Sequence, residues 1–177
     1  MELVEPSVKY KNSFIAAVRE YQNDDGFDYR TKKYRTLSVE KLEKYFDDYV
    51  EGELSHSRGE NLPEGYVPCS EYWLVDDGEF IGRATIRHEL NDKLKQLGGH
   101  IGYDIRPTMR GRGYGNRIMA LALEKAKALG ISRALVTCDI RNVPSRRIIE
   151  KNGGVLQDQV ENPDSDYDQL RFWVDTK

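Results

Sequence analysis

A turn rich in glycine and arginine, residues 106–117, constrains the fold of this chain more than any other segment. It joins a predicted strand at 100–105 to the most regular predicted helix, 116–129. Glycines alternate within it at Gly111, Gly113 and Gly115. They let the backbone bend tightly and present N–H groups that no Cβ obstructs. Because amides at a helix N-terminus and the helix dipole bind anions, the segment predicts an anion site suited to a pyrophosphate.

The turn also carries a local excess of positive charge. Its arginines are Arg106, Arg110, Arg112 and Arg117. Guanidinium groups favour a phosphate-rich ligand. No lysine follows a glycine here as in a P-loop, and the dinucleotide fingerprint requires a glycine where Asn116 stands. A different phosphate ligand is therefore expected, with a plain surface turn as the alternative.

Hydrophobic periodicity along the rest of the chain predicts one α/β or α+β domain, with a central mixed β-sheet flanked by helices. Strands are predicted at 2–5, 72–75, 79–88, 100–105, 134–138, 155–160 and 168–174, and helices at 8–22, 116–129 and 142–151. A further helix is capped by Ser38 and ended by Gly52. The strand at 134–138 has the short apolar pattern of a buried parallel strand. Residues 51–70 lack a period and are expected to form an ordered loop near the substrate.

Composition narrows the possible functions. The chain has 27 Lys and Arg against 30 Asp and Glu, and this net charge of −3 argues against a general nucleic-acid binder. Its longest apolar run is far too short to span a membrane, and no export signal opens the sequence. Cys69 and Cys138 lie far apart, and the three histidines have no partners at metal-ligand spacing. A cytoplasmic protein without a metal, a membrane or a nucleic-acid partner is expected.

Two motifs carry a resemblance to a known family. Residues 110–115, Arg-Gly-Arg-Gly-Tyr-Gly, resemble the (Q/R)xxGx(G/A) motif of the GNAT superfamily of acyl-CoA N-acyltransferases. Residues 142–145, Asn-Val-Pro-Ser, resemble the family's NxxS box, and Gly153-Gly154 fits the turn that follows it. The resemblance implies a single GNAT-like domain over 1–177. Within it, 1–70 would hold the acceptor-side helices and loop, 71–160 the acetyl-CoA-binding core and 161–177 the last strand.

The resemblance also implies how acetyl-CoA, the cosubstrate, would bind. The strand before the loop splays from its neighbour in this family, and its backbone pairs with the pantetheine arm; here it contains Tyr103, Asp104 and Ile105. The loop that would hold the pyrophosphate comprises Arg110, Gly111, Arg112, Gly113, Tyr114, Gly115 and Asn116. Asn142 and Ser145 would contact the cofactor from across the groove.

The implied reaction is direct transfer of an acetyl group to a primary amine in a ternary complex. Glu89 and His100 are the candidate bases, with a solvated glutamate and a strand-end histidine as the ordinary alternatives. Many relatives carry a tyrosine where Ile149 stands, so the general acid stays open between Ser145, Tyr103 and water. A non-catalytic acyl-CoA sensor is the alternative function. The sequence leaves the acceptor open, and a homodimer through the strand at 172–174 is possible.

Overall fold

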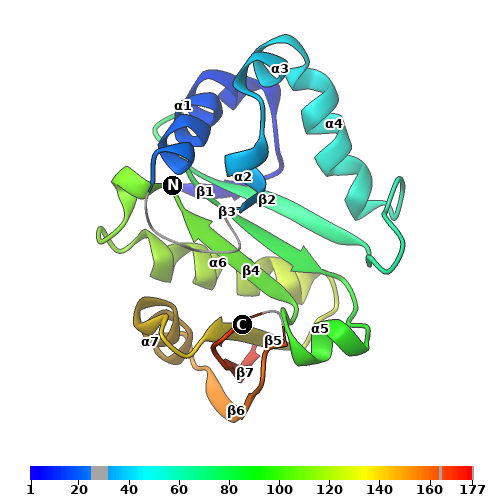
Figure 1. The fold of residues 1–177 in the computed structure, drawn as a ribbon, viewed down its shortest axis with the longest axis vertical. Coiled ribbons are helices and arrows are strands. Elements are labelled where there is room, and N and C mark those ends of the chain that lie inside the picture. Colours follow the sequence, from blue (N-terminus) through cyan, green and yellow to red (C-terminus); the bar gives the residue numbers. More distant parts are fainter. Residues whose placement is uncertain (25–31, 164, 177) are drawn as a thin grey trace.

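The computed structural model of the protein describes residues 1–24, 32–163 and 165–176. Its N-terminal part contains β1 (Glu2–Val4), the 3-10 helix η1 (Val8–Tyr10), α1 (Lys11–Gln22), α2 (Lys32–Thr36), α3 (Val39–Lys44) and α4 (Phe46–Ser57). The middle contains β2 (Cys69–Asp76), β3 (Glu79–Arg87), α5 (Asp92–Gln96), β4 (Ile101–Ile105), the 3-10 helix η3 (Pro107–Met109) and α6 (Tyr114–Ala128). The chain ends with β5 (Arg133–Asp139), α7 (Val143–Lys151), β6 (Val155–Val160) and β7 (Gln169–Asp175) (Figure 1).

The predicted α/β class is confirmed, with the sheet divided into two sections rather than continuous. One section has the order β1-β2-β3-β4 and the other β5-β7-β6, and every ladder within them is antiparallel. Among the described residues, one isolated bridge, between Gly99 and Val136, joins the sections, and beside it His100 N donates to Leu135 O at 2.7 Å. Beyond this bridge the described residues of β4 and β5 form no ladder. The two strands therefore converge at His100 and separate toward their C-terminal ends.

Two strand predictions need correction. The strand expected to be of the parallel type is β5, and its ladder partner is β7, which runs antiparallel to it. The last strand, β7, was expected to offer an edge for a homodimer, but it lies between β5 and β6. The outer strand of this section is β6, where Val155 is 64% exposed. Strand order is decided by pairing across the fold, which a short apolar run does not encode.

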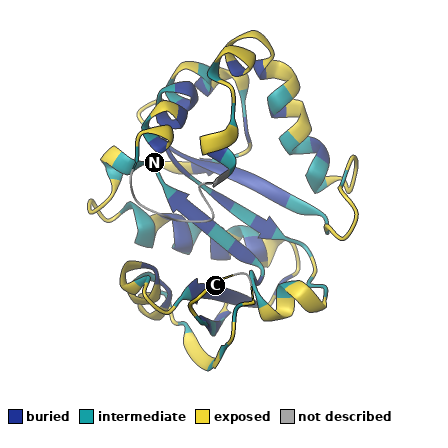
Figure 2. Cartoon of the chain, viewed as in Figure 1, coloured by how far each residue is buried: buried dark blue, intermediate teal, exposed yellow. Residues whose placement is uncertain are grey.

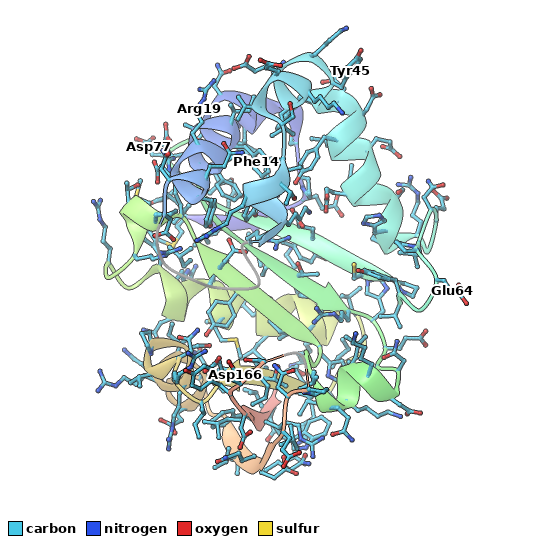
Figure 3. All side chains as sticks on the ribbon, in the orientation of Figure 1. Phe14, Arg19, Tyr45, Glu64, Asp77 and Asp166 are labelled. Carbon is cyan, nitrogen blue, oxygen red and sulfur yellow. The ribbon has the colours of Figure 1, made fainter. Side chains whose placement is uncertain are left out.

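Two apolar cores hold the layers together. Side chains of α6 contact residues from both sheet sections, so the first core includes Leu74, Ile118 and Phe172. The second core lies between α1–α4 and the opposite face of β2 and β3; Phe14 and Trp73 stack there with ring centroids 4.6 Å apart. Figure 1 shows α1–α4 gathered above the first sheet section, and Figure 3 shows Phe14 pointing into this layer. Figure 2 shows the buried strands enclosed by helices whose outer faces are exposed.

The second predicted helix differs from the observed one at both its middle and its end. Ser38 does cap α3, accepting a hydrogen bond from Lys41 N, but the backbone breaks at Tyr45 before α4 begins. Gly52 does not end the helix, because α4 continues to Ser57. A glycine inside a helix costs only about 1 kcal/mol relative to alanine. Packing of α4 against the second core, through Val50 among others, outweighs that cost. The expected loop at 51–70 is therefore helical in its first part.

The hairpin between β2 and β3 agrees with the sequence prediction. Asp77 and Gly78 have φ angles of 47° and 77°, the left-handed conformation that a tight two-residue turn requires. Over the described ranges, no helix is both long and apolar enough to cross a membrane. The same residues contain no group of three or more His, Cys, Asp or Glu side chains that could hold a metal ion.

Candidate functional site

The separation of β4 from β5 exposes one backbone edge of β4. Arg87 N donates to His100 O at 2.8 Å, and Arg106 N donates to Ile81 O at 2.9 Å. Because hydrogen-bonded pairs alternate along an antiparallel ladder, the even residues of β4 direct their peptide groups to β3. Tyr103 and Ile105 therefore direct theirs toward β5. Asp104 directs its own to β3, away from the gap.

The glycine turn ends at the N-terminus of α6, beside the open end of this gap. Gly111 and Gly113 have φ angles of 76° and 88°, and Gly113 is the residue that precedes the first turn of α6. No side chain of the described residues caps this helix, and Asn116 Oδ1 is buried without a hydrogen-bond partner. An added Cβ at Gly115 would lie 2.5 Å from Ile148 Cδ1, so this glycine allows α6 and α7 to pack closely. The uncapped amides form an anion cradle.

The four arginines of the turn have two different roles. Arg106 is buried and pairs with Glu20 at 2.7 Å and with Glu79 at 3.2 Å. Arg110 Nη1 lies 2.8 Å from Asp24 Oδ2 and its Nε donates to Ile105 O, so its guanidinium fastens the turn to the end of α1 and to β4. The exposed pair that has no ion-pair partner among the described residues is Arg112 and Arg117. Two of the four arginines in the turn, Arg106 and Arg110, therefore hold the fold together.

The second sequence motif lies across the gap from β4. Asn142 is the N-cap of α7 and accepts a hydrogen bond from Ser145 N at 3.0 Å. Ser145 Oγ lies 3.0 Å from Tyr103 Oη, so the two hydroxyls connect α7 with β4. Ile149 is fully buried beneath them. The structure thus brings Tyr103, Asn142 and Ser145 close together, with Asn142 and Ser145 across the gap from β4.

The two candidate bases lie away from this group. Glu89 is exposed and follows the end of β3. His100 lies where β4 and β5 converge, and its Nδ1 accepts a hydrogen bond from Leu135 N at 2.9 Å. Burial and the charge of Arg87 lower the pKa of His100, so the ring is neutral near pH 7 and carries its proton on Nε2. Ser145 is at the opposite, open end of the gap.

A buried cluster of charges on the α1–α4 face of the sheet has no counterpart in the sequence prediction. Arg83 Nη1 donates to Glu71 Oε2 at 2.9 Å and its Nε donates to Asp104 Oδ2 at 2.8 Å. Tyr21 also donates to Asp104, at 2.6 Å, so this carboxylate binds protein groups. Lys33 Nζ lies 2.6 Å from Glu53 Oε1 and 3.2 Å from Glu71 Oε2.

These contacts separate the pKa values of the two glutamates. Burial and the nearby charge of Glu71 raise the pKa of Glu53 to about 7. Burial opposes ionisation of Glu71 as well, but the charges of Lys33 and Arg83 lower its pKa well below the ordinary range. The sequence signal for this cluster is an ionisable residue within an otherwise apolar strand, as in Gly82-Arg83-Ala84. Its partners are distant in the sequence and could not be found from it.

Comparison with protein families decides the identity. A family model described as an acetyltransferase (GNAT) domain matches residues 13–155. The chain belongs to the GNAT family of acetyltransferases. It is therefore an acyltransferase with acetyl-CoA as its cosubstrate, as the motif resemblance implies. A search of curated proteins finds no match to the chain.

Solved structures of other GNAT proteins share the fold. A putative GNAT-family acetyltransferase from Bordetella pertussis is 18% identical, covers 97% of this chain and 93% of its own, and has a TM-score of 0.63. The microcin C7 self-immunity acetyltransferase MccE, in complex with acetyl-CoA and AMP, has a TM-score of 0.69 at 13% identity, with 98% and 91% covered. RimL, a ribosomal L7/L12 alpha-N-protein acetyltransferase in complex with coenzyme A, has a TM-score of 0.65 at 17% identity, with 99% and 94% covered.

The residues of the site fit acetyl-CoA. The amides at the uncapped N-terminus of α6 need an acceptor from a ligand. Asn116 Oδ1, which is buried and has no partner among the described residues, needs a donor. The β4 edge with Tyr103 and Ile105 suits an extended amide-bearing arm, because peptide groups there face β5 rather than β3.

Proposed function

We propose that this GNAT protein transfers the acetyl group of acetyl-CoA directly to a primary amine in a ternary complex. One observation carries the proposal: β4 and β5 separate beside an uncapped helix N-terminus that is entered through left-handed glycines. This arrangement offers an anion cradle and a backbone edge at the same end of the sheet. Among the described residues, neither Cys69 nor Cys138 forms a disulfide, which supports a reducing compartment, the cytoplasm, as the proposed location.

The proposed binding residues follow from this geometry. The amides from Gly111 to Asn116 would hold the pyrophosphate, and the exposed side chain of Arg112 adds charge there. The peptide groups of Tyr103 and the N–H of Ile105 would hold the pantetheine arm, since the carbonyl of Ile105 already accepts from Arg110 Nε. Asn142 and Ser145 would contact the arm from the other side. Acetyl-CoA supplies the activated thioester carbonyl.

The chain itself must move two protons. The hydroxyls of Tyr103 and Ser145 share a hydrogen bond at 3.0 Å, and we assign this pair as the general acid. The base is a carboxylate rather than His100, since Nδ1 of that ring is occupied by Leu135 N–H and Nε2 carries the proton. Glu89 is the predicted carboxylate, and Glu53, with a pKa of about 7, is the one that the structure adds. The pH profile of kcat/KM in Glu89→Gln and Glu53→Gln separates the two, because only loss of the base removes its acid limb.

Two measurements in one sample test the function: calorimetric titration with acetyl-CoA, then release of free thiol in the presence of a panel of amines. Gly113→Ala should weaken acetyl-CoA binding about tenfold or more, because a Cβ enters the anion cradle. Gly130→Ala is the matched control, since Gly130 follows the same helix with a φ of 83° and equally open surroundings. Both variants carry the same backbone strain, of about 1–2 kcal/mol.

The outcomes separate the competing functions. Amine-dependent thiol release supports the transferase. Acetyl-CoA binding without release on any amine would favour the non-catalytic sensor. Equal affinity for acetyl-CoA in Gly113→Ala and Gly130→Ala would show that the turn is not the cofactor cradle.

A further inference from the structure

A cavity of about 490 Å³ lies at the converging end of β4 and β5, opposite the end that faces the glycine turn. His100 and Leu135, which form the junction between the two sheet sections, line it. Its other lining residues are Leu90, Lys95, Gln157, Arg171 and Trp173. Its size is typical of a small-molecule site. A cosubstrate held at the open end of the gap leaves this end to the second substrate.

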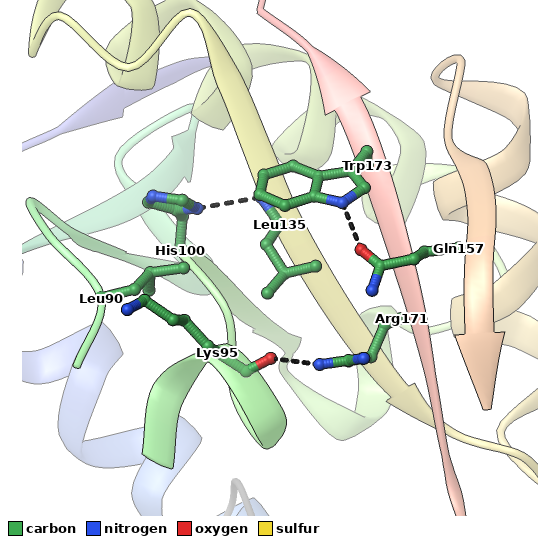
Figure 4. A pocket seen from close by; sticks show the side chains of 7 residues that line it. All are labelled: Leu90, Lys95, His100, Leu135, Gln157, Arg171 and Trp173. Carbon is green, nitrogen blue, oxygen red and sulfur yellow. Dashed lines mark hydrogen bonds between the residues drawn. The ribbon is translucent and has the colours of Figure 1, made fainter. Parts of the chain in front are cut away.

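The cavity has an aromatic wall that the protein holds in a fixed orientation. Trp173 Nε1 donates to the side-chain oxygen of Gln157, and the guanidinium of Arg133 lies 5.2 Å from the centre of the indole ring. Figure 4 shows Leu90 and Lys95 on one side of the cavity and Trp173, Gln157 and Arg171 on the other. A flat or branched apolar group fits between such walls without reordering them.

The polar groups of the cavity are mainly hydrogen-bond donors. His100 directs its protonated Nε2 away from Leu135, because Nδ1 accepts the backbone hydrogen bond. Arg171, 14% exposed, is fixed by both oxygens of Asp158 and by Lys95 O. Within the described part of the chain, the exposed Lys95 Nζ pairs with the exposed Asp92 at 3.2 Å, and such a surface pair is weak, so its ammonium is available to a ligand at little cost. No carboxylate is among the described residues that line the cavity.

We propose that this cavity binds the non-reacting part of the acceptor, and that this part combines an aromatic or branched apolar group with a carboxylate. The acceptor is then a small amine-bearing acid, such as an aromatic amino acid, rather than a polyamine. Trp173 and Leu135 would contact the apolar group, while Lys95 and His100 Nε2–H would bind the carboxylate. A polyamine would meet cations without a lining carboxylate to pair with. This inference rests on the proposed function, since it assigns the acceptor of that reaction.

Binding can be measured without turnover. In the ¹⁵N-labelled protein, the indole N–H signals of Trp73 and Trp173 report two separate places, and Trp173→Phe assigns them. The probes are 3-phenylpropanoate and its uncharged analogue 3-phenylpropanol. We expect 3-phenylpropanoate to shift the Trp173 signal and leave Trp73 unchanged, because Trp73 is buried in the second core. The carboxylate should improve affinity about fivefold over the alcohol.

Two lysines of α5 provide a matched pair of variants. Lys95→Gln should remove the preference for the carboxylate, whereas Lys93→Gln, exposed on the same short helix but outside the cavity lining, should keep it. An unmoved Trp173 signal at millimolar probe, or equal losses in the two variants, overturns the inference.

Turnover then separates this inference from the proposed function. With acetyl-CoA present, L-phenylalanine should release thiol faster than phenethylamine, which lacks the carboxylate, and faster than spermidine. Faster release with spermidine keeps the transferase and overturns the acceptor class. If no amine causes thiol release and acetyl-CoA does not bind, the proposed function itself is wrong.

Discussion

At the residue scale, Glu53 makes stability depend on pH in an unusual direction. Its pKa rises from an ordinary 4.5 to about 7 in the folded protein, so the folded state holds a proton that the unfolded state has lost in this interval. A group with a raised folded pKa contributes stability below the unfolded value and loses it as pH rises through the folded one. We therefore expect the wild type to lose about 1–3 kcal/mol relative to Glu53→Gln between these two pH values. Denaturant unfolding of both proteins across the interval measures the difference.

Asp48→Asn is the control for this measurement, because Asp48 is exposed on the same helix, α4. The difference in unfolding free energy between Asp48→Asn and the wild type should stay constant between these two pH values. If the unfolding free energy of Glu53→Gln changes with pH in parallel with that of the wild type, Glu53 is already ionised below pH 7. The lowered pKa of Glu71 affects stability in a different pH range, because the stability that its ionised form contributes is lost only as pH falls below 4.5.

Local sequence signals predict part of the geometry around the candidate site. The glycines precede α6, and Asn142 caps α7 by accepting from Ser145 N, because each acts on backbone only a few residues away. The arginine count was less informative. Arg110 and Arg106 serve ion pairs with Asp24 and Glu20, about 86 residues distant in the chain, and no local pattern encodes such a partner.

At the scale of elements, Arg83 ties three strands together. It lies on β3 and binds Glu71 of β2 and Asp104 of β4, with its own side chain 13% exposed and theirs 5% and 4%. Arg83→Met would remove the cation that pairs with Asp104 and one of the two cations beside Glu71, which keeps Lys33 at 3.2 Å. Removing one partner of a buried pair costs about 3–5 kcal/mol. We expect a fall of this size in the unfolding free energy measured with denaturant.

Arg19→Met is the matched control for Arg83→Met. Arg19 also binds a carboxylate, Glu43 at 2.7 Å, but both side chains are more than half exposed. Such a surface pair contributes at most about 1 kcal/mol. Similar losses in the two variants would mean that water reaches Arg83 and that burial does not govern its pairs.

Elements with strong local signals could be predicted from the sequence, and those decided by packing could not. The helix α6 has a clear apolar face, and the β2–β3 hairpin has its Asp-Gly turn. By contrast, α4 runs through Gly52 because its apolar face packs on the second core. The neighbour of β5 could not be predicted either, since pairing joins it to residues about 36 positions later.

At the scale of the whole molecule, the division of the sheet is the feature on which the proposed function depends and which no single strand encodes. Gly99 has a φ of 63°, and an added Cβ would clash with Leu135 O, so the junction requires glycine. The strand sequences give β-propensity but not the point at which two strands separate. That point is fixed by how α6 and α7 pack beneath the two sections, through contacts such as Gly115 against Ile148.

The same packing predicts that the two sheet sections unfold together despite their single bridge. Trp73 reports the first section and Trp173 the second, and α6 contributes Ile118 and Ala122 to a core that both sections share. Exposing one section would also expose these α6 side chains, which makes a half-folded state costly. In Trp173→Phe and Trp73→Phe, each of which retains one tryptophan, fluorescence and circular dichroism transitions in denaturant should coincide. A fluorescence midpoint that differs from the circular dichroism midpoint in either variant would mean that the separated strands mark a boundary between independently unfolding parts. Coincident midpoints would mean that β4 and β5 are separated only locally, and that the core shared by the two sheet sections makes them unfold as one unit.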